Sequence, residues 1–573
     1  MPAPRARGSG GGDGSLSKRG VAPGQDTAGG SGRCLRWVPS AAAASSGPGP
    51  GRPSPGLPRR RKYSTACRGS GQRGPGVGVG HRPTASFSTY AGNTLRTHLV
   101  NVPARLARPP TPSARPTGDS RREPADEVRG LAGNAPGEYS DDTQMAMCIA
   151  EVSATGADLR SSDALDRIAG NFLRWKREGA SDIGAQTREV LGAVSHVSGA
   201  GIAAAMRDAA AELHKRTGRS AGNGSLMRTA PVALAYLGQP EALAEAARAV
   251  SELTHHDPLA ADACVLWCAG IRRAVLDGTF DGVREGLDLL PAQRRHQWSS
   301  WLAEAESKPP EQFRPNGFVV TALQAAWSAI THTDVPDHNP GHGSFPCQHL
   351  ERALTAAVRV GDDTDTVAAI TGALLGARWG SSAVPLAWQR IVHGWPNRRA
   401  ADLIRLAVLT AQGGRTDHAG WPGCARAPRP AVAPLMLAHA HDPGVILGNL
   451  HTDAAAAGAG AVVSLCRVGC EDFDDVAVVN RVSTWLVDQP GANAQPHFVV
   501  DQAARIVLEL RKEGHVVLLH CAAGQSRTPA VAARYTTLTT GIPARSALAE
   551  LRGLLGAHGW TLNPELRQVV EQL

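Results

Sequence analysis

The sequence predicts three parts: a disordered basic tail over residues 1–134, an all-helical domain over residues 135–410, and a small α/β domain with a largely parallel sheet over residues 437–573. Three observations support this division. A chain of 573 residues is too long for one hydrophobic core. Positive charge is concentrated near the N-terminus. After a Gly- and Pro-rich linker at residues 411–436, helical periodicity gives way to strands that alternate with helices.

The tail carries the basic charge of the chain. Residues 1–120 contain 18 Lys or Arg and 3 Asp or Glu, so they hold a charge of +15 and leave −6 for the rest. Rich in Gly, Pro, Ser and Arg, this segment cannot bury enough apolar surface to offset the entropy of ordering. The run Arg59–Lys62 could attract a polyanion through counterion release. Aromatic residues are not interleaved with this charge and no folded nucleic-acid module accompanies it, so we expect a solvated tail, and a nucleic-acid partner is unlikely.

The cellular compartment is predicted from missing signals. The sequence contains no run of about 18 apolar residues, and its first residues lack the apolar core of a secretory signal. We therefore expect no membrane insertion and a cytoplasmic location.

The helical domain is predicted from amphipathic Ala-rich stretches such as Leu159–Trp175, Ile202–Lys215 and Leu243–Leu253, which alternate with short polar connectors. Beyond the linker, helical patterns at 498–512, 528–538 and 544–556 are interleaved with short β-rich runs. These runs are Gly444–Leu447, Ala461–Leu465, Ser483–Val487 and His515–His520. Strands that alternate with helices indicate a largely parallel sheet.

The last of these strands leads into a loop suited to an anion. His520 is followed at once by Cys521, and the loop continues through Gly524 and Ser526 to Arg527 and Thr528-Pro529. A tight loop between a strand and a helix aims backbone N–H groups at one anion, and we expect Gly524 and Ser526 to line it. These dipoles and Arg527 favour the nucleophilic thiolate of Cys521. The guanidinium can grip two phosphoryl oxygens, and the Thr528 hydroxyl can steady the departing thiolate.

Cys-x5-Arg preceded by His, with Gly at the fourth position, resembles the dual-specificity and protein-tyrosine phosphatases over residues 440–573. The resemblance implies a phosphocysteine intermediate, no cofactor, a phosphorylated protein or small phosphate ester as substrate, and a general acid on an upstream loop. Asp488 lies 33 residues before Cys521 and is the preferred acid. Asp501 is the alternative, although it falls inside a helical pattern. The structural alternatives are a buried, inert cysteine and an ordinary loop aspartate.

Two clusters of oxygen ligands mark the central domain. The first is Ser140-Asp141-Asp142, and the second contains Asp363, Asp365 and Thr366 more than two hundred residues later. Carboxylates and hydroxyls suit Mg or Mn, and two converging clusters would hold a pair of cations. Two metal ions can polarise a water molecule or a sugar hydroxyl.

Together with the segments between and after them, these clusters resemble the ADP-ribosylglycohydrolase family over residues 135–400. The segments are Gly222-Asn223-Gly224-Ser225, Thr254-His255-His256 and the small-residue run Thr366–Gly376. The family has an all-α fold and uses two Mg or Mn ions to cleave ADP-ribose from a protein side chain. The resemblance implies six metal ligands, phosphate binding by backbone amides of the Gly222–Ser225 loop, His255 near the ribose, and ADP-ribosylated protein or ADP-ribose as the partner. The six ligands are Ser140, Asp141, Asp142, Asp363, Asp365 and Thr366.

The sequence departs from the family pattern at two places. Ser140 stands where the family usually has threonine, which keeps the hydroxyl. Residues 95–134 show no Gly-rich helix ending in Gly-Asp-Ala, with which the family normally begins. Whether that helix is lost or replaced is left open. Helix N-capping is the structural alternative for the two clusters, and a satisfied surface or core histidine is the alternative for His255.

These features predict a bifunctional hydrolase that removes ADP-ribose with one domain and phosphate with the other. The alternative is a phosphatase whose central domain only binds ADP-ribose or ADP-ribosylated protein. A scaffold in which neither site turns over is the third possibility.

Overall fold

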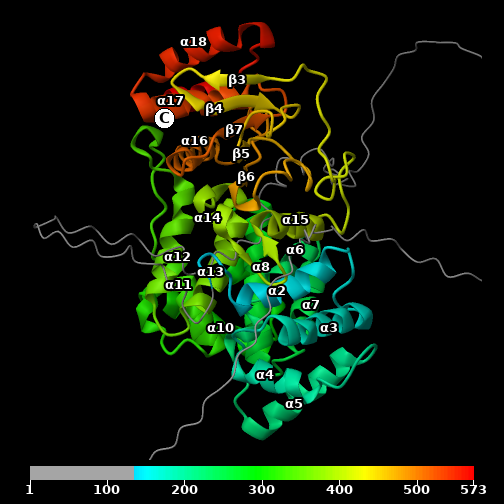
Figure 1. The fold of residues 1–573 in the computed structure, drawn as a ribbon. Helices are drawn as coiled ribbons and strands as arrows, with labels where there is room; N and C mark the ends of the chain where they lie inside the picture. The colour runs from blue at the N-terminus through cyan, green and yellow to red at the C-terminus, as the bar shows by residue number, and fades with distance from the viewer. Residues whose placement is uncertain (1–134) are drawn as a thin grey trace, which may run out of the picture. The chain divides into compact units, whose positions relative to one another are not determined.

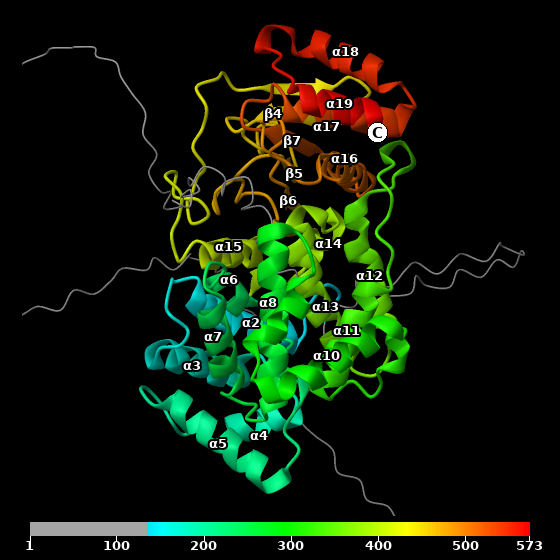
Figure 2. The same ribbon diagram turned by 180° about the vertical axis from the view of Figure 1, so that it is seen from behind.

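The computed structural model describes residues 135–573, which are shown from opposite sides in Figures 1 and 2. The disorder predicted for residues 1–134 lies outside this range, as does the basic run. The central region consists of helices linked by loops, together with one short antiparallel pair of strands, β1 (His393–Gly394) and β2 (Arg398–Arg399). The helices are α2 (Asp141–Ser153), α3 (Ser162–Glu178), α4 (Ala185–Ala193), α5 (Ile202–Thr217), α6 (Ala230–Ala235), α7 (Pro240–Ser251), α8 (Pro258–Asp277), α9 (Gly282–Glu285), α10 (Ala292–Ser307), α11 (Val319–Thr331), α12 (His349–Arg359), α13 (Thr364–Trp379), α14 (Leu386–Ile391) and α15 (Ala400–Ala411).

Helix α8 lies in the core of the helical domain. The Asp257 carboxylate caps it by accepting the N–H of Leu259, and the helix ends before Gly278, whose φ of 70° few other residues adopt. Side chains are buried along most of its length, and α7, α11 and α13 pack on it. The Trp267 indole donates to the carbonyl of Ile370 over 2.9 Å. This bond ties α8 to α13 and helps to fix α13, which carries the second acidic cluster.

Helix α2 is also buried and carries the first cluster at its start. It packs against α3, α6, α13 and α15, which leaves little of it exposed. The Trp175 indole of α3 donates to the Gln144 side chain over 2.6 Å. The acidic starts of α2 and α13 are thus held by well-packed helices. The predicted helices at Leu159–Trp175, Ile202–Lys215 and Leu243–Leu253 correspond to α3, α5 and α7.

The C-terminal region is built on a five-stranded sheet in the order β3-β4-β7-β5-β6. Only β3 is antiparallel to its neighbour, so the expectation of a largely parallel sheet is met. Helices α16 and α17 pack on the sheet, and α18 and α19 pack on α17. The elements are β3 (Met436–His439), β4 (Asp442–Asn449), β5 (Ala461–Ser464), β6 (Arg481–Ser483), β7 (Val517–Cys521), α16 (Pro496–Lys512), α17 (Arg527–Thr540), α18 (Ala544–Leu555) and α19 (Pro564–Gln572).

One predicted strand is shifted. The sequence indicated a strand at Ser483–Val487, but β6 ends at Ser483 and the next residues form a loop. Both backbone groups of Val487 bond to the Asn493 side chain over 2.8 Å instead of to a neighbouring strand. Local bonding by Asn thus replaces strand pairing at Val487, whereas the N–H groups of Thr484 and Leu486 still donate to the carbonyls of Ser464 and Leu465. Strand β3 and helix α19 were not predicted.

The predicted linker packs against the C-terminal domain. Between α15 and β3 it has no regular structure, but its Cys424 carbonyl accepts the N–H of Cys470 at 3.1 Å. The Asp472 carboxylate accepts the N–H of Ala427 at 2.9 Å. These bonds fix the segment beside the loop that follows β5. Among residues 135–573, no helix combines the length and apolar character needed to cross a membrane.

Candidate metal centre and cysteine loop

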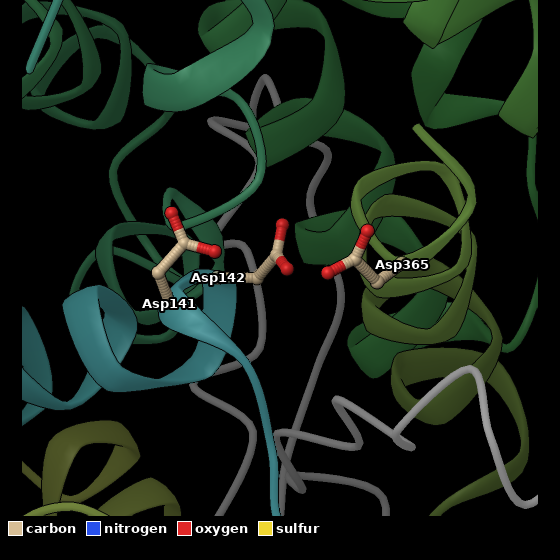
Figure 3. A group of neighbouring side chains, drawn as sticks. All are labelled: Asp141, Asp142 and Asp365. Atoms are coloured by element: carbon tan, nitrogen blue, oxygen red, sulfur yellow. The ribbon is translucent and has the colours of Figure 1, made fainter. Parts of the chain in front are cut away.

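The two acidic clusters of the central domain converge. Asp141 and Asp142 come from the first turn of α2, and Asp365 comes from the first turn of α13. Their carboxylates point toward one another, and one oxygen of each lies within 4.8 Å of the others (Figure 3). Side chains more than two hundred residues apart in sequence therefore share one small volume.

The remaining predicted ligands lie around these three carboxylates. The Ser140 hydroxyl donates to Oδ2 of Asp142 over 2.5 Å. The Asn223 amide donates to Oδ2 of Asp363 over 2.7 Å, and the Thr366 hydroxyl also hydrogen-bonds this carboxylate. Side-chain oxygen atoms from both predicted clusters therefore lie around one shared site.

Negative charge is unfavourable within this cluster. Burial raises the pKa of Asp141 to about 7, and the carboxylates of Asp182, Asp365 and Asp363 add to the rise. Burial also raises the pKa of Asp142 well above its ordinary value, with further contributions from Asp141 and Asp365. Asp142 Oδ1 is buried and has no hydrogen-bond partner among residues 135–573. A buried acceptor left in this way is costly unless something binds it.

Helix capping does not explain the clusters. Ser140 and Asp363 occupy the N-cap positions of α2 and α13, yet neither side chain accepts a capping hydrogen bond. Elsewhere in the same domain, Ser161 caps α3 and Asp257 caps α8 through their side chains. The acidic helix starts therefore differ from ordinary caps, because their oxygen atoms are directed at one another.

The donor set fits divalent cations. Carboxylate and hydroxyl oxygens are the ligands that Mg and Mn prefer. Cations among these oxygens would remove the mutual repulsion and satisfy the unpartnered Oδ1 of Asp142. The chemistry of the residues and the orphaned acceptor thus agree on the class of ligand.

The loop beside the cluster is only partly free to bind phosphate. The backbone N–H of Asn223 donates to the Gly317 carbonyl at 3.1 Å, so this amide is already used. Asn223 and Ser225 lie in a short 3₁₀ turn (Asn223–Ser225) and are buried, whereas Gly222 and Gly224 are partly exposed. Backbone binding of phosphate would therefore depend on the other amides of Gly222–Ser225.

His255 is a buried, neutral histidine that contacts this loop. The Arg228 guanidinium donates to the Thr254 hydroxyl over 2.7 Å, which leaves that hydroxyl to donate to Nδ1 of His255 over 2.7 Å. The proton of the imidazole therefore lies on Nε2, which faces Gly222 and Gly224. Burial, together with the charge of Arg228, holds its pKa well below the ordinary value. His255 is thus a hydrogen-bonded histidine of the core, and it also borders the loop at which the substrate was expected.

Two residues near the cluster were not predicted. Asp182 lies on the loop before α4 and adds to the rise in the pKa of Asp141. Asn316 is fully buried, and its side-chain oxygen accepts the N–H of Asp363 at 2.9 Å while its carbonyl accepts from Asn223 at 3.0 Å. The sequence offers no spacing signal for either, since each approaches the clusters only through the tertiary fold.

In the C-terminal domain, the predicted cysteine loop connects β7 to α17. Cys521 is the last residue of β7 and is buried, and its sulfur accepts the N–H of Gly524 at 3.3 Å. Gly524 has φ +80°, and a Cβ there would lie 2.4 Å from Cδ2 of Leu435. Glycine is therefore required at this turn for both its conformation and the close approach of Leu435.

Arg527 and Asp488 meet at this loop. Nη1 of Arg527 donates to the Leu486 carbonyl over 2.9 Å, and its Nε lies 3.5 Å from Asp488. The Ser526 hydroxyl donates to Asp488 Oδ1 over 2.6 Å. The structure thus brings the preferred general acid next to the loop. The alternative, Asp501, is buried against Arg534 at 2.7 Å and lies in α16, where it holds the helices together.

His520 and Thr528 support the loop from behind. The fully buried His520 bonds through Nε2 to the Ser464 hydroxyl over 2.7 Å, and burial lowers its pKa to about 4. It is therefore neutral at physiological pH and serves to fix the end of β7. The Thr528 hydroxyl donates to the Gly448 carbonyl at 3.5 Å rather than to sulfur. Any help from Thr528 to a departing thiolate would require this hydroxyl to turn.

The helical fold and its carboxylate cluster define a mainly α-helical domain with a site suited to divalent cations. A family model described as ADP-ribosylglycohydrolase matches residues 108–419, more than half of the sequence. The chain belongs to the ADP-ribosylglycohydrolase family. The match begins at residue 108, so it includes part of the segment in which no opening helix was recognised; residues 108–134 lie outside the described range.

Among known proteins, the chain is similar to the ADP-ribosylarginine hydrolase Tri1 of Pseudomonas putida (strain GB-1), with 26% identity over 271 residues. The aligned region covers 46% of this chain and 66% of that relative, just under two thirds of its length. A solved "ADP-ribosylglycohydrolase-related protein complex" aligns with 57% of this chain and 97% of its own, at 24% identity and a TM-score of 0.35. Human DUSP28 aligns with 25% of this chain and 95% of its own, at 17% identity and a TM-score of 0.22.

Proposed function

We propose that the central domain is a cytoplasmic hydrolase that releases ADP-ribose from modified arginine side chains with the help of two Mg or Mn ions. The convergence of Asp141, Asp142 and Asp365, with one buried oxygen left unpartnered, is the observation that carries the proposal. Membership of the family and the activity for which the Pseudomonas relative is named support the reaction class and the arginine linkage.

Each group of residues has a role in this proposal. The carboxylates, with the hydroxyls of Ser140 and Thr366, would hold the cations, which supply Lewis-acid stabilisation of developing charge. The Nε2–H of His255 and the free amides of the Gly222–Ser225 loop would orient the substrate. Asp182 stands at the exposed side of the cluster, where it can accept a proton from a water molecule or a sugar hydroxyl.

Two measurements test binding and turnover separately. Protein loaded with Mn and dialysed should retain bound metal, and it should release ADP-ribose from ADP-ribosylarginine. Asp142→Ala and Asp365→Ala should lose both properties. Metal retained without release would favour the alternative in which the central domain only binds ADP-ribose or ADP-ribosylated protein. Unchanged cation binding in both variants would refute the proposed site.

We further propose that the C-terminal domain is a cysteine-dependent phosphatase acting on a phosphorylated protein or a small phosphate ester. The observation that favours it is the contact between Cys521 Sγ and the Gly524 N–H, in a loop that also carries Arg527 and touches Asp488. Attack by sulfur on phosphorus would form an S–P bond as the ester P–O bond breaks, and Asp488 would protonate the departing oxygen. Water would then release phosphate from Cys521.

Phosphate release from an aryl phosphate tests this second proposal. Arg527→Lys keeps the positive charge but loses the planar fork that can grip two oxygens, so turnover should fall sharply. The matched control is Arg545→Lys, because Arg545 is an exposed arginine on α18. Equal turnover in the two variants would mean that the loop binds something other than a transferred phosphoryl group.

A further inference from the structure

A further cavity is cationic, and none of the residues that line it belongs to the cysteine loop or to the acidic cluster. It has a volume of about 160 Å³ and is enclosed by α14, α15, the segment that follows α15, and the ends of β5 and β6. Four arginines line it, namely Arg390, Arg405, Arg467 and Arg481, and no Asp or Glu does. This volume is well above the roughly 15 Å³ that one water molecule requires. It is below the roughly 300 Å³ of the smallest usual organic-ligand sites, so it suits a small anion.

Arg481 is the arginine with most unused binding capacity. It opens the edge strand β6, where Val482 points into the core and Arg481 and Ser483 share the opposite face. Its guanidinium forms no hydrogen bond or ion pair within residues 135–573, and its Nε is buried without a partner. Burial lowers the pKa of Arg481, and the positive charges of Arg405 and Arg399 lower it further. The carboxylates of Asp474 and Asp475 act in the opposite direction. A half-buried cation without an acceptor is unfavourable unless an anion joins it.

Arg467 is fixed in position by aromatic rings. Its guanidinium carbon lies 4.4 Å from the ring centroid of Trp421 and 3.8 Å from that of Trp485. Asp417 pairs with one end of the guanidinium, and the buried Nε has no partner. Because the two indoles already hold the planar guanidinium of Arg467 in place, little side-chain entropy is lost when it binds an anion. Rigid cations of this kind favour binding of phosphoryl oxygens.

The other two arginines differ in availability. Arg390 is satisfied, because both terminal nitrogens donate to Glu513 over 2.6 Å. Arg405 has only a distant acceptor, Asp402 at 3.8 Å. The Ser382 hydroxyl, which also lines the cavity, is buried and has no hydrogen-bond partner among the described residues. Two guanidinium groups and one hydroxyl thus remain for a ligand, in addition to the exposed edge of Arg467.

We propose that this cavity is a second binding site for a phosphoryl anion, held by Arg405, Arg467 and Arg481 beside the rings of Trp421 and Trp485. The site borders the segment that carries Asp488, because Trp485 precedes Leu486, whose carbonyl accepts from Arg527 at 2.9 Å. Its occupant is either free phosphate or the phosphate of an ester whose planar group packs on the indoles. Binding here does not depend on turnover at Cys521.

Isothermal titration calorimetry of full-length protein tests the proposal, with EDTA present and Arg527→Ala introduced to disable the cysteine loop. Inorganic phosphate and phenyl phosphate are titrated separately. We expect saturable binding to persist in Arg527→Ala and to weaken at least tenfold when Arg481→Gln is added. Arg545→Gln, which removes an exposed arginine on α18, should leave the affinity unchanged. If Arg481→Gln does not fold, Arg405→Gln provides the same comparison on a different element.

The outcomes are distinct. Tighter binding of phenyl phosphate than of phosphate would identify an aromatic ester as the occupant, and equal affinities would identify free phosphate. Absence of saturable binding in Arg527→Ala would overturn the proposal. Equal affinity in Arg481→Gln, Arg405→Gln and the Arg545→Gln control would do so as well.

Discussion

Neutralising Asp141 should stabilise the metal-free protein. Burial and neighbouring carboxylates raise the pKa of this side chain from 3.8 to about 7 in the folded state. An acid whose folded pKa is raised destabilises the fold: the effect is absent below pH 3.8, grows with rising pH, and is complete above pH 7. Asp141→Asn keeps the shape of the side chain and removes this titration.

The structure gives the size of the effect. At about 1.4 kcal/mol per pH unit, the rise in the pKa of Asp141 corresponds to about 4 kcal/mol above pH 7. At pH 4.5 the penalty is only about 1 kcal/mol. For a domain of this size 1 kcal/mol shifts the unfolding temperature by roughly 2–4 °C. Asp141→Asn should therefore raise the unfolding temperature of EDTA-treated protein by roughly 10 °C at pH 8 and by only about 2–4 °C at pH 4.5.

The advantage of Asp141→Asn at pH 8 should shrink from about 4 to about 1 kcal/mol when cations are added. Mn at about one hundred times its dissociation constant would stabilise wild type by about 2.7 kcal/mol, and Asp141→Asn should lose most of this gain. Asp163→Asn is the matched control, because Asp163 also lies in the first turn of a helix but its side chain is 84% exposed. If Asp141→Asn lowers the unfolding temperature of metal-free protein equally at both pH values, the carboxylate makes a favourable contact and the repulsion argument is wrong.

Three further predictions concern the cysteine loop. Cys521→Ser should reduce aryl phosphate turnover to background with unchanged circular dichroism, because serine does not supply a thiolate; substantial residual turnover would refute the nucleophile. Asp488→Asn should slow the hydrolysis of alkyl phosphates at least roughly tenfold more than that of p-nitrophenyl phosphate, whose leaving group needs no proton. Equal losses of rate on both substrates would exclude Asp488 as the general acid. Gly524→Ala, at φ +80° and 2.4 Å from Leu435, should cost about 1–2 kcal/mol in urea unfolding and lower turnover; wild-type behaviour would show that the loop relaxes freely.

Much of the acidic site could be predicted because its residues stand in short sequence patterns that can be recognised without the fold. Asp141 and Asp365 each open a helix, and oxygen-rich triplets at two helix starts indicated a shared cation site before any contact was known. Asp182 and Asn316 could not be found in this way. Asp182 lies on an irregular loop without neighbouring acids, and Asn316 accepts hydrogen bonds from the Asp363 backbone and the Asn223 side chain, both far away in sequence. Their roles depend on how the loops fold over the helix starts.

The same distinction holds for the sheet domain. The buried strand that ends at Cys521 was visible as a continuous apolar run, and β7 occupies nearly that range. The run Ser483–Val487 was equally apolar, yet β6 ends at Ser483, and Asn493 takes the hydrogen bonds of Val487. Apolar composition indicates burial, and it does not decide whether another strand or a nearby side chain supplies the hydrogen bonds. The cavity beside Arg481 was also beyond prediction, since its walls come from segments separated by up to about one hundred residues.

The acidic cluster is better explained by ligand binding than by folding. Within the same domain, Asp158 bonds to Arg160 and Tyr236, which lower its pKa, so that carboxylate is stabilised by its neighbours. For Asp141 and Asp142, burial and neighbouring carboxylates outweigh the hydrogen bonds that lower their pKa values, and one oxygen of Asp142 has no hydrogen-bond partner among residues 135–573. Capping does not account for them, because the N-cap side chains of α2 and α13 accept no capping hydrogen bond. A site that weakens the metal-free fold while directing oxygen atoms at one point is what cation binding requires.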